Sequence, residues 1–490
     1  MPLAEQTDAQ HSSKVSRAVD WIRRDLRGLA VALQPHRKCL QGVHSFRQTS
    51  DHGQRHLHLR IDANGNGLLL VDTAHIFHLN SSAARIARQL LTGWTPRQVL
   101  RNMEHAHSGV SRKRLRGDIQ AIERLVRTVQ DPAVRCPSCA LPALARREAF
   151  TTSPSAPLKV DAALSYDCNN RCSHCYNEAG RRSMPTLSDH QWMKAIDRLH
   201  QIGIPQIIFT GGEPLLHPSI TTLVNHANRC GMITGLNTNG RPLATPGMAQ
   251  GLAQAGLSHI QITLHSPRQS LHDRIARASG FEQTVQGIRN ALEENLHVIT
   301  NTTVTRLNVE EVEELIEFLD VLGIHTFAMN GIIHAGEGCS DPNALEPEEL
   351  APLLECVQEQ AAGRGMRFLW YTPTEHCRLS PLEMDLGLKR CNAAEYSICV
   401  EPNGDILPCQ SYYQTAGNIL EDPWERIWNS PLFRSFRDRT RLPEKCDLLQ
   451  KCWDCPDLKL CGGGCRLERE KKTQQARTKR GWSTCRSVSA

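Results

Sequence analysis

Three cysteines lie close together in the pattern Cys168-x3-Cys172-x2-Cys175, directly followed by Tyr176. Thiolates are soft donors that suit zinc or iron–sulfur clusters. A structural zinc site takes four ligands, and no fourth cysteine or obvious histidine ligand stands at finger spacing nearby. Three cysteines can instead hold three irons of a [4Fe-4S] cluster, which leaves the fourth iron open to a ligand that is not protein. The alternatives are a partial zinc knuckle and a redox pair formed by Cys172 and Cys175.

A second set of cysteines lies in the C-terminal part of the chain. Cys391 and Cys409 flank Gly404, which belongs to a hairpin-turn sequence over 401–405. The other thiols follow the spacing C-x2-C-x5-C-x3-C with one later cysteine, and they are Cys452, Cys455, Cys461, Cys465 and Cys485. The alternative for this set is a pair of zinc sites, which the C-x2-C spacing also suits.

Two polar loops follow predicted strands of the central region. Residues 211–214 read Gly-Gly-Glu-Pro and come directly after a predicted strand over 206–210. Glycines let the backbone approach a ligand closely, and the Glu213 carboxylate can accept a hydrogen bond from an ammonium group. Asn239 follows the next predicted strand, in Asn-Thr-Asn-Gly over 237–240.

Composition narrows the class of protein. The chain has 490 residues, of which 19 are cysteine, and its net charge of +6 is modest for this length. The N-terminus is polar without the apolar segment of a signal peptide, and no run reaches the ~18 apolar residues of a membrane span. Clustered cysteines in a cytosolic protein are more often metal ligands than disulfides. We therefore expect a cytoplasmic metalloprotein. The modest charge and an aromatic content of only 5% indicate that it binds neither nucleic acid nor membrane.

The pattern of strands and helices over 160–335 favours an α/β fold with a parallel sheet. Trp192, Ile196 and Leu199 mark the apolar face of one predicted helix. The cysteine triplet follows the first strand, at the edge of the sheet where such folds place their sites. The strands are predicted over 160–167, 206–210, 232–237, 260–265, 298–305 and 326–333, with a closing helix over 346–362 and a last strand over 366–370.

The chain length predicts about three domains. We expect a polar segment with one helix over 16–33, a small domain, a linker, an α/β core and a cysteine-rich domain, with bounds 1–50, 51–130, 131–159, 160–369 and 370–490. In the small domain a turn over 62–67 separates two strands, and helices follow over 83–91, 95–105 and 111–129. Cys136 and Cys139 of the linker are expected to be surface thiols, and Cys230, Cys339 and Cys356 to be packing residues.

The cysteine triplet together with Gly-Gly-Glu-Pro closely resembles the radical SAM family. The resemblance implies a partial (β/α)6 barrel whose cluster binds the amino and carboxylate groups of S-adenosylmethionine at the open iron. One electron then cleaves the sulfonium to methionine and a 5′-deoxyadenosyl radical. The implied cofactor contacts are His174 beside the adenine, together with Gly211, Gly212, Glu213, Pro214, Asn239, Thr263 and Asn301. His265 stands where many relatives have Asp, which leaves the substrate-side chemistry open.

The spacing of the C-terminal cysteines resembles the SPASM extension of peptide-modifying radical SAM enzymes, and all seven of its cysteines are present. The resemblance implies two auxiliary [4Fe-4S] clusters. One is held by Cys452, Cys455, Cys461 and Cys485. The other is held by Cys391, Cys409 and Cys465, with Cys377 as the first candidate for the fourth ligand and Cys446 or an open iron as alternatives.

Residues 51–130 resemble the peptide-recognition domain of the pyrroloquinoline quinone chaperone family, with His78–Ala83 and Leu91–Thr95 carrying the resemblance. This winged-helix-like domain binds a leader peptide as an added strand; the alternative is a purely structural role. The resemblances together imply a maturase that oxidatively cross-links a ribosomally made precursor peptide and receives electrons from a flavodoxin or ferredoxin. The alternatives are an enzyme acting on a small molecule such as a tetrapyrrole, a sulfatase-type maturase, and a non-enzymatic electron carrier or zinc-binding adaptor.

Overall fold

The computed structural model describes residues 41–50, 53–71, 75–106, 109–134, 137–141 and 154–479. The predicted helix over 16–33, Cys136, Cys485 and the side chain of Cys139 lie outside the described residues. The chain divides into two compact units, residues 1–144 and residues 145–490. Within the described residues, no helix is long and apolar enough to cross a membrane.

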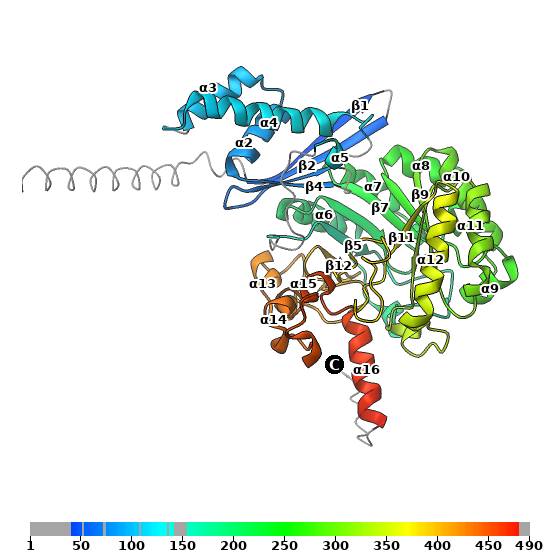
Figure 1. Ribbon diagram of the computed structural model, residues 1–490. Helices are drawn as coiled ribbons and strands as arrows, with labels where there is room; N and C mark the ends of the chain where they lie inside the picture. Colours follow the sequence, from blue (N-terminus) through cyan, green and yellow to red (C-terminus); the bar gives the residue numbers. More distant parts are fainter. Residues whose placement is uncertain are drawn as a thin grey trace, which may run out of the picture. The chain divides into compact units, whose positions relative to one another are not determined.

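The first unit is built on an antiparallel sheet with the order β1-β2-β3-β4, drawn in blue in Figure 1. The turn predicted over 62–67 joins β2 to β3, and Gly65 adopts a left-handed φ of 83° there. Strand β1 was not predicted, although all nine of its residues pair with β2. The strands are β1 (Gly42–Ser50), β2 (Gly53–Ile61), β3 (Gly67–Val71) and β4 (His75–Leu79).

Helices cover one face of this sheet. Alternate residues of β2 and β3, among them Leu57, Leu59 and Leu69, are buried against Ala84 of α2 and Leu125 of α4, because side chains two residues apart share a face of a strand. The three predicted helices are confirmed within one or two residues at each end. The helices are α2 (Ser81–Leu91), α3 (Pro96–Ala106), α4 (Arg112–Gln130) and α5 (Pro137–Ala140).

The second unit contains a nine-stranded sheet with the order β11-β10-β9-β8-β7-β6-β5-β12-β13. Neighbouring strands from β11 to β12 are parallel, and only β13 runs antiparallel to its neighbour. The order of the described strands does not close on itself, as expected of a partial barrel. The strands are β5 (Lys159–Ala163), β6 (Gln206–Thr210), β7 (Ile233–Thr238), β8 (His259–Thr263), β9 (His297–Thr303), β10 (Thr326–Asn330), β11 (Arg367–Trp370), β12 (Ser397–Val400) and β13 (Ile406–Leu407).

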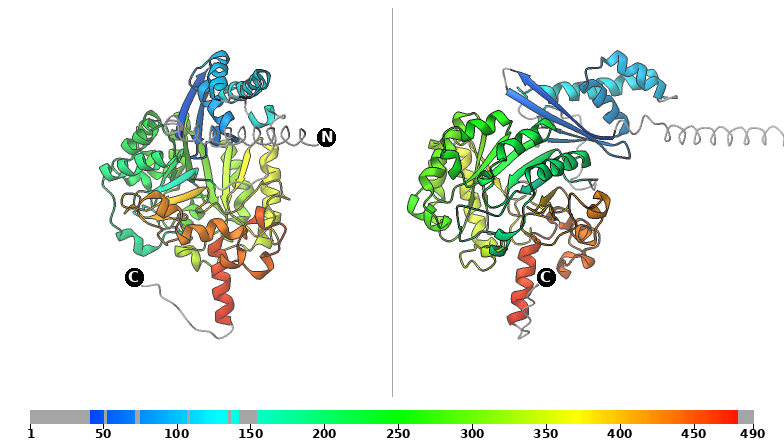
Figure 2. Two further views of the ribbon diagram at one scale, coloured as in Figure 1. Left: turned by 90° about the vertical axis from the view of Figure 1, so that its left-hand side faces the viewer. Right: turned by 180° about the vertical axis from the view of Figure 1, so that it is seen from behind.

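Helices connect the parallel strands and flank the sheet (Figures 1 and 2). The predicted apolar face of α6 is confirmed, since Trp192, Ile196 and Leu199 are fully buried. A capping box between Ser188 and Gln191 begins that helix, and Gly203 ends it in a left-handed conformation. The helices are α6 (Asp189–Ile202), α7 (Ile220–Arg229), α8 (Met248–Ala255), α9 (Gln269–Ala276), α10 (Phe281–Glu293), α11 (Val312–Val321) and α12 (Pro347–Gly363).

The cysteine-rich region shares the sheet of the α/β core. Strand β12 pairs with β5 in the register Ile398 to Val160, and both side chains are fully buried. The rest of the region is short helices and loops around the buried ion pair of Arg390 and Glu395, whose closest N–O distance is 2.6 Å. Its α-helices are α13 (Trp424–Trp428), α14 (Pro431–Arg437), α15 (Leu458–Cys461) and α16 (Arg466–Lys479).

Candidate functional site

The three cysteines of the first motif lie on one irregular loop between β5 and α6. The amide of Cys175 donates to the Cys172 carbonyl at 3.2 Å, which folds the loop back on itself. The amides of Arg171 and Ser173 donate to the last carbonyls of α9, those of Ala276 and Ile275, at 3.0 Å each. The loop is therefore held by backbone hydrogen bonds although it has no regular structure of its own.

The electrostatic environment shows that these thiols are neighbours. Burial raises the pKa of Cys168 and of Cys175, and it raises the pKa of Cys172 to about 12, with further increases from the Cys175 and Cys168 thiols. Ionisation of all three of these half-buried thiols would need a cation among them. The donor set thus fits a soft metal centre with three protein ligands.

The Gly-Gly-Glu-Pro loop packs directly against the chain that leads into the cysteine loop. The Gly212 amide donates to Ser165 O at 2.8 Å and the Glu213 amide to Asp167 O at 2.7 Å. A Cβ atom on Gly211 would lie 2.1 Å from Ser165 O, and one on Gly212 would lie 2.2 Å from Asp167 O. The sequence suggested that these glycines make room for a ligand; the structure shows that they make room for the chain's own backbone.

Glu213 is 1% exposed and accepts three hydrogen bonds from its own chain. Its donors are the amides of Leu215 at 3.0 Å and Asn239 at 2.7 Å, and the Thr238 hydroxyl at 2.6 Å. Burial raises the pKa of this carboxyl to about 7, although these hydrogen bonds oppose the shift. Glu213 therefore joins the loop that follows β6 to the end of β7, with Pro214 beginning the short 3-10 helix after it.

The loop after β7 reaches the cysteine loop through two side chains. The side-chain Nδ2 atom of Asn239 donates to Asn169 Oδ1 at 2.5 Å and lies 3.9 Å from Cys168 Sγ. Arg241 Nη1 donates to the Asn169 carbonyl at 2.6 Å and to Asn170 Oδ1 at 2.9 Å. Asn239 was predicted at the site, whereas Arg241 was missed because nothing in its sequence context distinguishes it from a surface arginine.

Histidines line the other side of the cysteine loop. The His265 Nε2 atom lies 3.8 Å from Cys172 Sγ, and the ring of His265 is 5.0 Å from that of His174 and 5.3 Å from that of His272. His265 is 1% exposed, and its Nδ1 atom has no hydrogen-bond partner in the described structure. Burial lowers the pKa of His174 to about 4 and also lowers that of His265, so both rings are neutral near pH 7.

Thr263 and Asn301 stand opposite each other at the carboxyl ends of β8 and β9. The side-chain Nδ2 atom of Asn301 donates to Asn330 Oδ1 at 2.9 Å, while the Oδ1 atom of Asn301 is buried without a partner in the described structure. A buried acceptor without a donor is costly. Asn301 thus offers a hydrogen-bond acceptor at the end of the sheet where the cysteine loop lies.

Two further segments cover the cysteine loop, and neither was predicted to do so. A Cβ atom on Gly336, in the loop after β10, would lie 2.6 Å from the Cys175 carbonyl oxygen. From the cysteine-rich region, the Tyr413 hydroxyl donates to the Tyr176 carbonyl at 3.1 Å, and the Arg181 guanidinium stacks 4.0 Å from the centre of the Tyr413 ring. The C-terminal region is therefore in direct contact with the first cysteine motif.

Cys391, Cys409 and Cys465 form one group in the C-terminal region. Burial and then the neighbouring Cys391 thiol raise the pKa of Cys409 and raise that of Cys465 to about 11. A small cavity lies beside Cys391, with Arg439 and Arg469 in its lining. Both arginines are buried, and the Nε atom of each lacks a partner in the described structure. Thiols, a cavity and buried positive charge fit a negatively charged iron–sulfur cluster.

Cys377 belongs to a different group from the one predicted. Lys451 Nζ donates to Cys377 Sγ at 3.5 Å, and the thiols of Cys461 and Cys377 both contribute to the raised pKa of Cys452, after burial and the Glu375 carboxylate. The contacts of the described residues therefore place Cys377 with Cys452 and Cys461. The sequence had instead predicted that Cys377 would complete the set of Cys391, Cys409 and Cys465. The reason is local: the loop after β11 folds onto α15, and the His376 amide donates to Cys461 Sγ at 3.4 Å.

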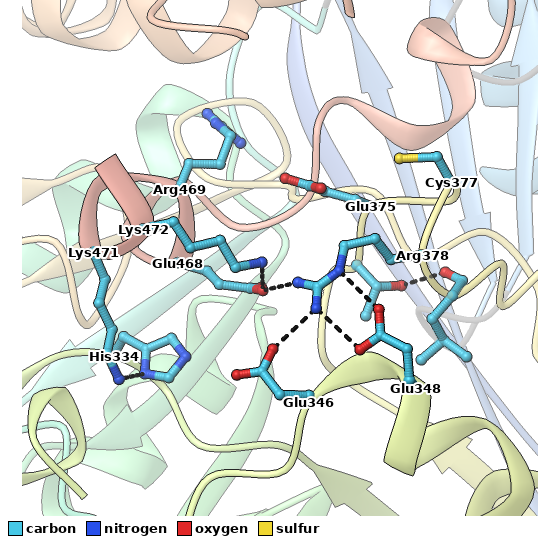
Figure 3. Close-up of polar contacts among 12 residues, drawn as sticks. His334, Glu346, Glu348, Glu375, Cys377, Arg378, Glu468, Arg469, Lys471 and Lys472 are labelled. Carbon is cyan, nitrogen blue, oxygen red and sulfur yellow. Dashed lines mark hydrogen bonds and ion pairs between the residues drawn. The ribbon is translucent and has the colours of Figure 1, made fainter. Parts of the chain in front are cut away.

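Arg378, the residue after Cys377, fixes this loop to two other elements. Figure 3 shows its guanidinium between carboxylates of α12 and α16. The N–O distances are 2.9 Å to Glu346, 3.1 Å to Glu348 and 3.6 Å to Glu468. Several charges in one network stabilise more than isolated surface pairs do. Arg378 thus holds the Cys377 loop against the core and the last helix.

Comparison with known families confirms the two predicted kinds of domain. Residues 163–319 match the radical SAM superfamily, and residues 391–456 match the SPASM iron–sulfur cluster-binding domain.

Relatives of known name share a large part of the chain. A PqqA peptide cyclase from Gluconobacter oxydans is 28% identical over 65% of this chain and 87% of its own length. An AdoMet-dependent heme synthase from Methanosarcina barkeri is 26% identical over 63% of this chain and 91% of its own. A mycofactocin maturase MftC from Mycobacterium ulcerans is 27% identical over 65% of this chain and 85% of its own length.

Solved structures confirm the fold. Streptococcus suis SuiB bound to its precursor peptide SuiA matches with a TM-score of 0.63 and 17% identity, over 86% of this chain and 96% of that structure. A structure of anSMEcpe with bound AdoMet and the Cp18Cys peptide matches with a TM-score of 0.50 and 16% identity, over 66% of this chain and 97% of that structure. At these identities the matches establish the predicted α/β fold and nothing further.

We predict that Gly212→Ala destabilises the second unit by at least about 2 kcal/mol, because the new Cβ atom would overlap the Asp167 carbonyl and push the cysteine loop away. Thermal unfolding measures the loss. Gly251→Ala in α8 is the matched control, since its nearest atom would be 3.8 Å away and alanine favours a helix. An unchanged unfolding temperature in Gly212→Ala would show that the two loops are not in close contact.

Proposed function

The chain is a radical SAM enzyme that uses iron–sulfur clusters and S-adenosylmethionine, and from this we propose that it oxidatively cross-links a ribosomally made precursor peptide. Relatives named as a peptide cyclase and a maturase support the proposal, as does the likeness to SuiB, which was solved with its precursor peptide. The observation that carries it is a half-buried three-thiol loop in a chain that also contains a separate sheet-and-helix unit.

We assign the core cluster to Cys168, Cys172 and Cys175, since their thiols share one half-buried loop and the Cys168 and Cys175 thiols both raise the pKa of Cys172. When bound, the cluster and S-adenosylmethionine supply the 5′-deoxyadenosyl radical that takes a hydrogen atom from the peptide. The chain's own task is to position the reacting groups and exclude water, because a primary radical reacts with whatever it touches.

The residues around the loop suit the cofactor contacts expected of them. Asn301 presents a buried acceptor without a donor, which suits a hydroxyl or ammonium group. Asn239 lies beside Cys168 and the Glu213 carboxylate. Glu213 already has three donors, so we assign it to holding the loops after β6 and β7 in place, with backbone groups of 211–214 available to the cofactor. His174 offers a neutral ring that adenine can pack on.

We propose two auxiliary clusters in the SPASM region. Cys391, Cys409 and Cys465 hold one of them beside the buried Arg439 and Arg469. Cys452, Cys455 and Cys461 hold the other, with Cys485 as the expected fourth ligand and Cys377 as a thiol within the same group. Electrons reach the enzyme from a flavodoxin- or ferredoxin-type protein. The many clustered thiols need a reducing compartment, so we place the enzyme in the cytoplasm.

The first unit is proposed to bind the leader segment of the peptide as an added strand at an edge of its sheet. This would keep the core peptide near the radical while it reacts, which raises its effective concentration. The second candidate substrate is a tetrapyrrole, which the heme synthase relative favours.

The cluster assignment predicts the behaviour of a triple variant, Cys168→Ala/Cys172→Ala/Cys175→Ala. After anaerobic reconstitution and reduction, the wild type should form 5′-deoxyadenosine from S-adenosylmethionine, and the variant should form none while keeping about eight irons in two auxiliary clusters. Chromatography of the nucleoside and an iron assay measure both. Cleavage by the variant would refute the assignment. A wild type with full iron and no cleavage would refute the enzyme class itself.

His265 is expected to tune the core cluster. The Nδ1 atom of His265 has no hydrogen-bond partner in the described structure, so a proton on Nδ1 would be a buried donor without an acceptor. The tautomer with the proton on Nε2 avoids this and directs its N–H at Cys172 Sγ. Such a bond stabilises the reduced cluster more than the oxidised one. His265→Phe should therefore lower the midpoint potential of the cluster by roughly 40 mV for each kcal/mol of this stabilisation that is lost. Redox titration followed by electron paramagnetic resonance measures it. His272→Phe is the control, and an equal shift in both variants would mean that only general polarity matters.

The substrate proposal is tested by co-expressing the chain with short peptides encoded beside its gene. The full chain should remove two hydrogens per cross-link from one peptide, detected by mass spectrometry. A chain lacking residues 1–135 should still form 5′-deoxyadenosine but leave the peptide unchanged. Conversion of a tetrapyrrole with every peptide untouched would instead favour the second candidate.

A further inference from the structure

Three metal-binding side chains of different kinds meet between α6 and α7, away from every cysteine assigned to a cluster. Asp197 lies on α6, His226 lies on α7, and Cys230 follows the last residue of α7. One ligand atom of each lies within 4.8 Å of the other two, and all three residues are half-buried. The two helices pack against each other through the apolar core of the second unit.

The helical register explains why these side chains converge. His226 and Cys230 are four residues apart, so they share one face of α7 one turn apart. Asp197 reaches both side chains from α6, since its Oδ1 atom contacts His226 Nε2 and Cys230 Sγ. The two helices thus offer a carboxylate, an imidazole and a thiol at one place.

The distances among the three ligand atoms are close to those of a tetrahedral zinc site. With Zn–O and Zn–N near 2.0 Å and Zn–S near 2.3 Å, the O–S separation is about 3.5 Å and the O–N separation about 3.3 Å. The Asp197 Oδ1 atom lies 3.4 Å from Cys230 Sγ and 2.7 Å from His226 Nε2. The first distance fits and the second must open, while the third pair, His226 Nε2 and Cys230 Sγ, lies within 4.8 Å. The Asp197 side chain, which would have to move, is 46% exposed.

We propose that Asp197, His226 and Cys230 bind a Zn²⁺ ion that joins α6 to α7 on the outside of the sheet. The mixture of thiol, imidazole and carboxylate suits zinc and disfavours magnesium or calcium, which take oxygen ligands. Water takes the fourth position. Cys230 is thereby a ligand, although the sequence suggested a packing residue. The site is independent of the proposed substrate and of the clusters.

The chain offers a matched control for this site. Cys356 on α12 donates to the Glu313 carboxylate of α11 at 3.3 Å, so it forms the same thiol–carboxylate pair between two outer helices. No histidine belongs to a metal-binding group with this pair among the described residues. Cys356→Ser therefore removes a comparable thiol without touching the proposed ligands.

The test uses the full chain with its clusters loaded, dialysed against zinc and then against a weak chelator. The wild type and Cys356→Ser should each retain one zinc per chain by mass spectrometry, and Cys230→Ser and His226→Gln should retain none. Zinc-edge X-ray absorption should show one sulfur near 2.3 Å and the other ligands near 2.0 Å.

The outcomes separate the proposal from adventitious binding. Zinc that persists in both Cys230→Ser and His226→Gln would be bound elsewhere, including at an incompletely loaded cluster, and would overturn the proposal. A wild type that holds no zinc would show that the three side chains are only a hydrogen-bonded group. A further check is thermal unfolding. Zinc should raise the unfolding temperature of the wild type and of Cys356→Ser, but not that of Cys230→Ser or His226→Gln.

Discussion

The structure of the second unit depends on keeping three half-buried thiols, Cys168, Cys172 and Cys175, within reach of one another. The loop that carries them has no regular secondary structure, so it cannot fix them by itself. Backbone carbonyls at the end of α9, the glycines after β6, the Asn239–Arg241 loop and the Gly336 loop each hold it from a different direction. Loss of any one of these contacts would let thiols that repel one another when ionised move apart.

The C-terminal region belongs to this arrangement and is not a separate appendage. Strand β12 extends the central sheet beyond β5, and Tyr413 touches the carbonyl of Tyr176. Arg439 and Arg469 bury positive charge beside Cys391 and Cys465. Glu395 lies 3.8 Å from Arg439, and thiols ionised around a metal centre would add further negative charge. A metal centre bound there would contribute to charge balance as well as to cross-linking, which would couple cluster loading to folding.

Much of the fold was predictable because its signals are local. Apolar strand segments that alternate with helical patterns predicted the strands β5 to β10 and their parallel direction, and the spacing of the cysteines predicted the domain types. What could not be predicted depends on contacts between distant residues. Strand β1 is polar and was recognisable only through its pairing with β2. The partners of Arg241, Gly336 and Cys377 follow from the folded positions of loops, and no periodicity encodes them.

The central claim is that the Cys168–Cys175 loop holds a cluster whose open iron binds S-adenosylmethionine. The most direct measurement is pulsed electron–nuclear double resonance of the reduced enzyme with S-adenosylmethionine carrying ¹⁵N in its amino group. We expect a nitrogen coupling to the cluster signal in the wild type and its absence when the three core cysteines are replaced. A coupling that survives their replacement, or none in a fully loaded wild type, would contradict the claim.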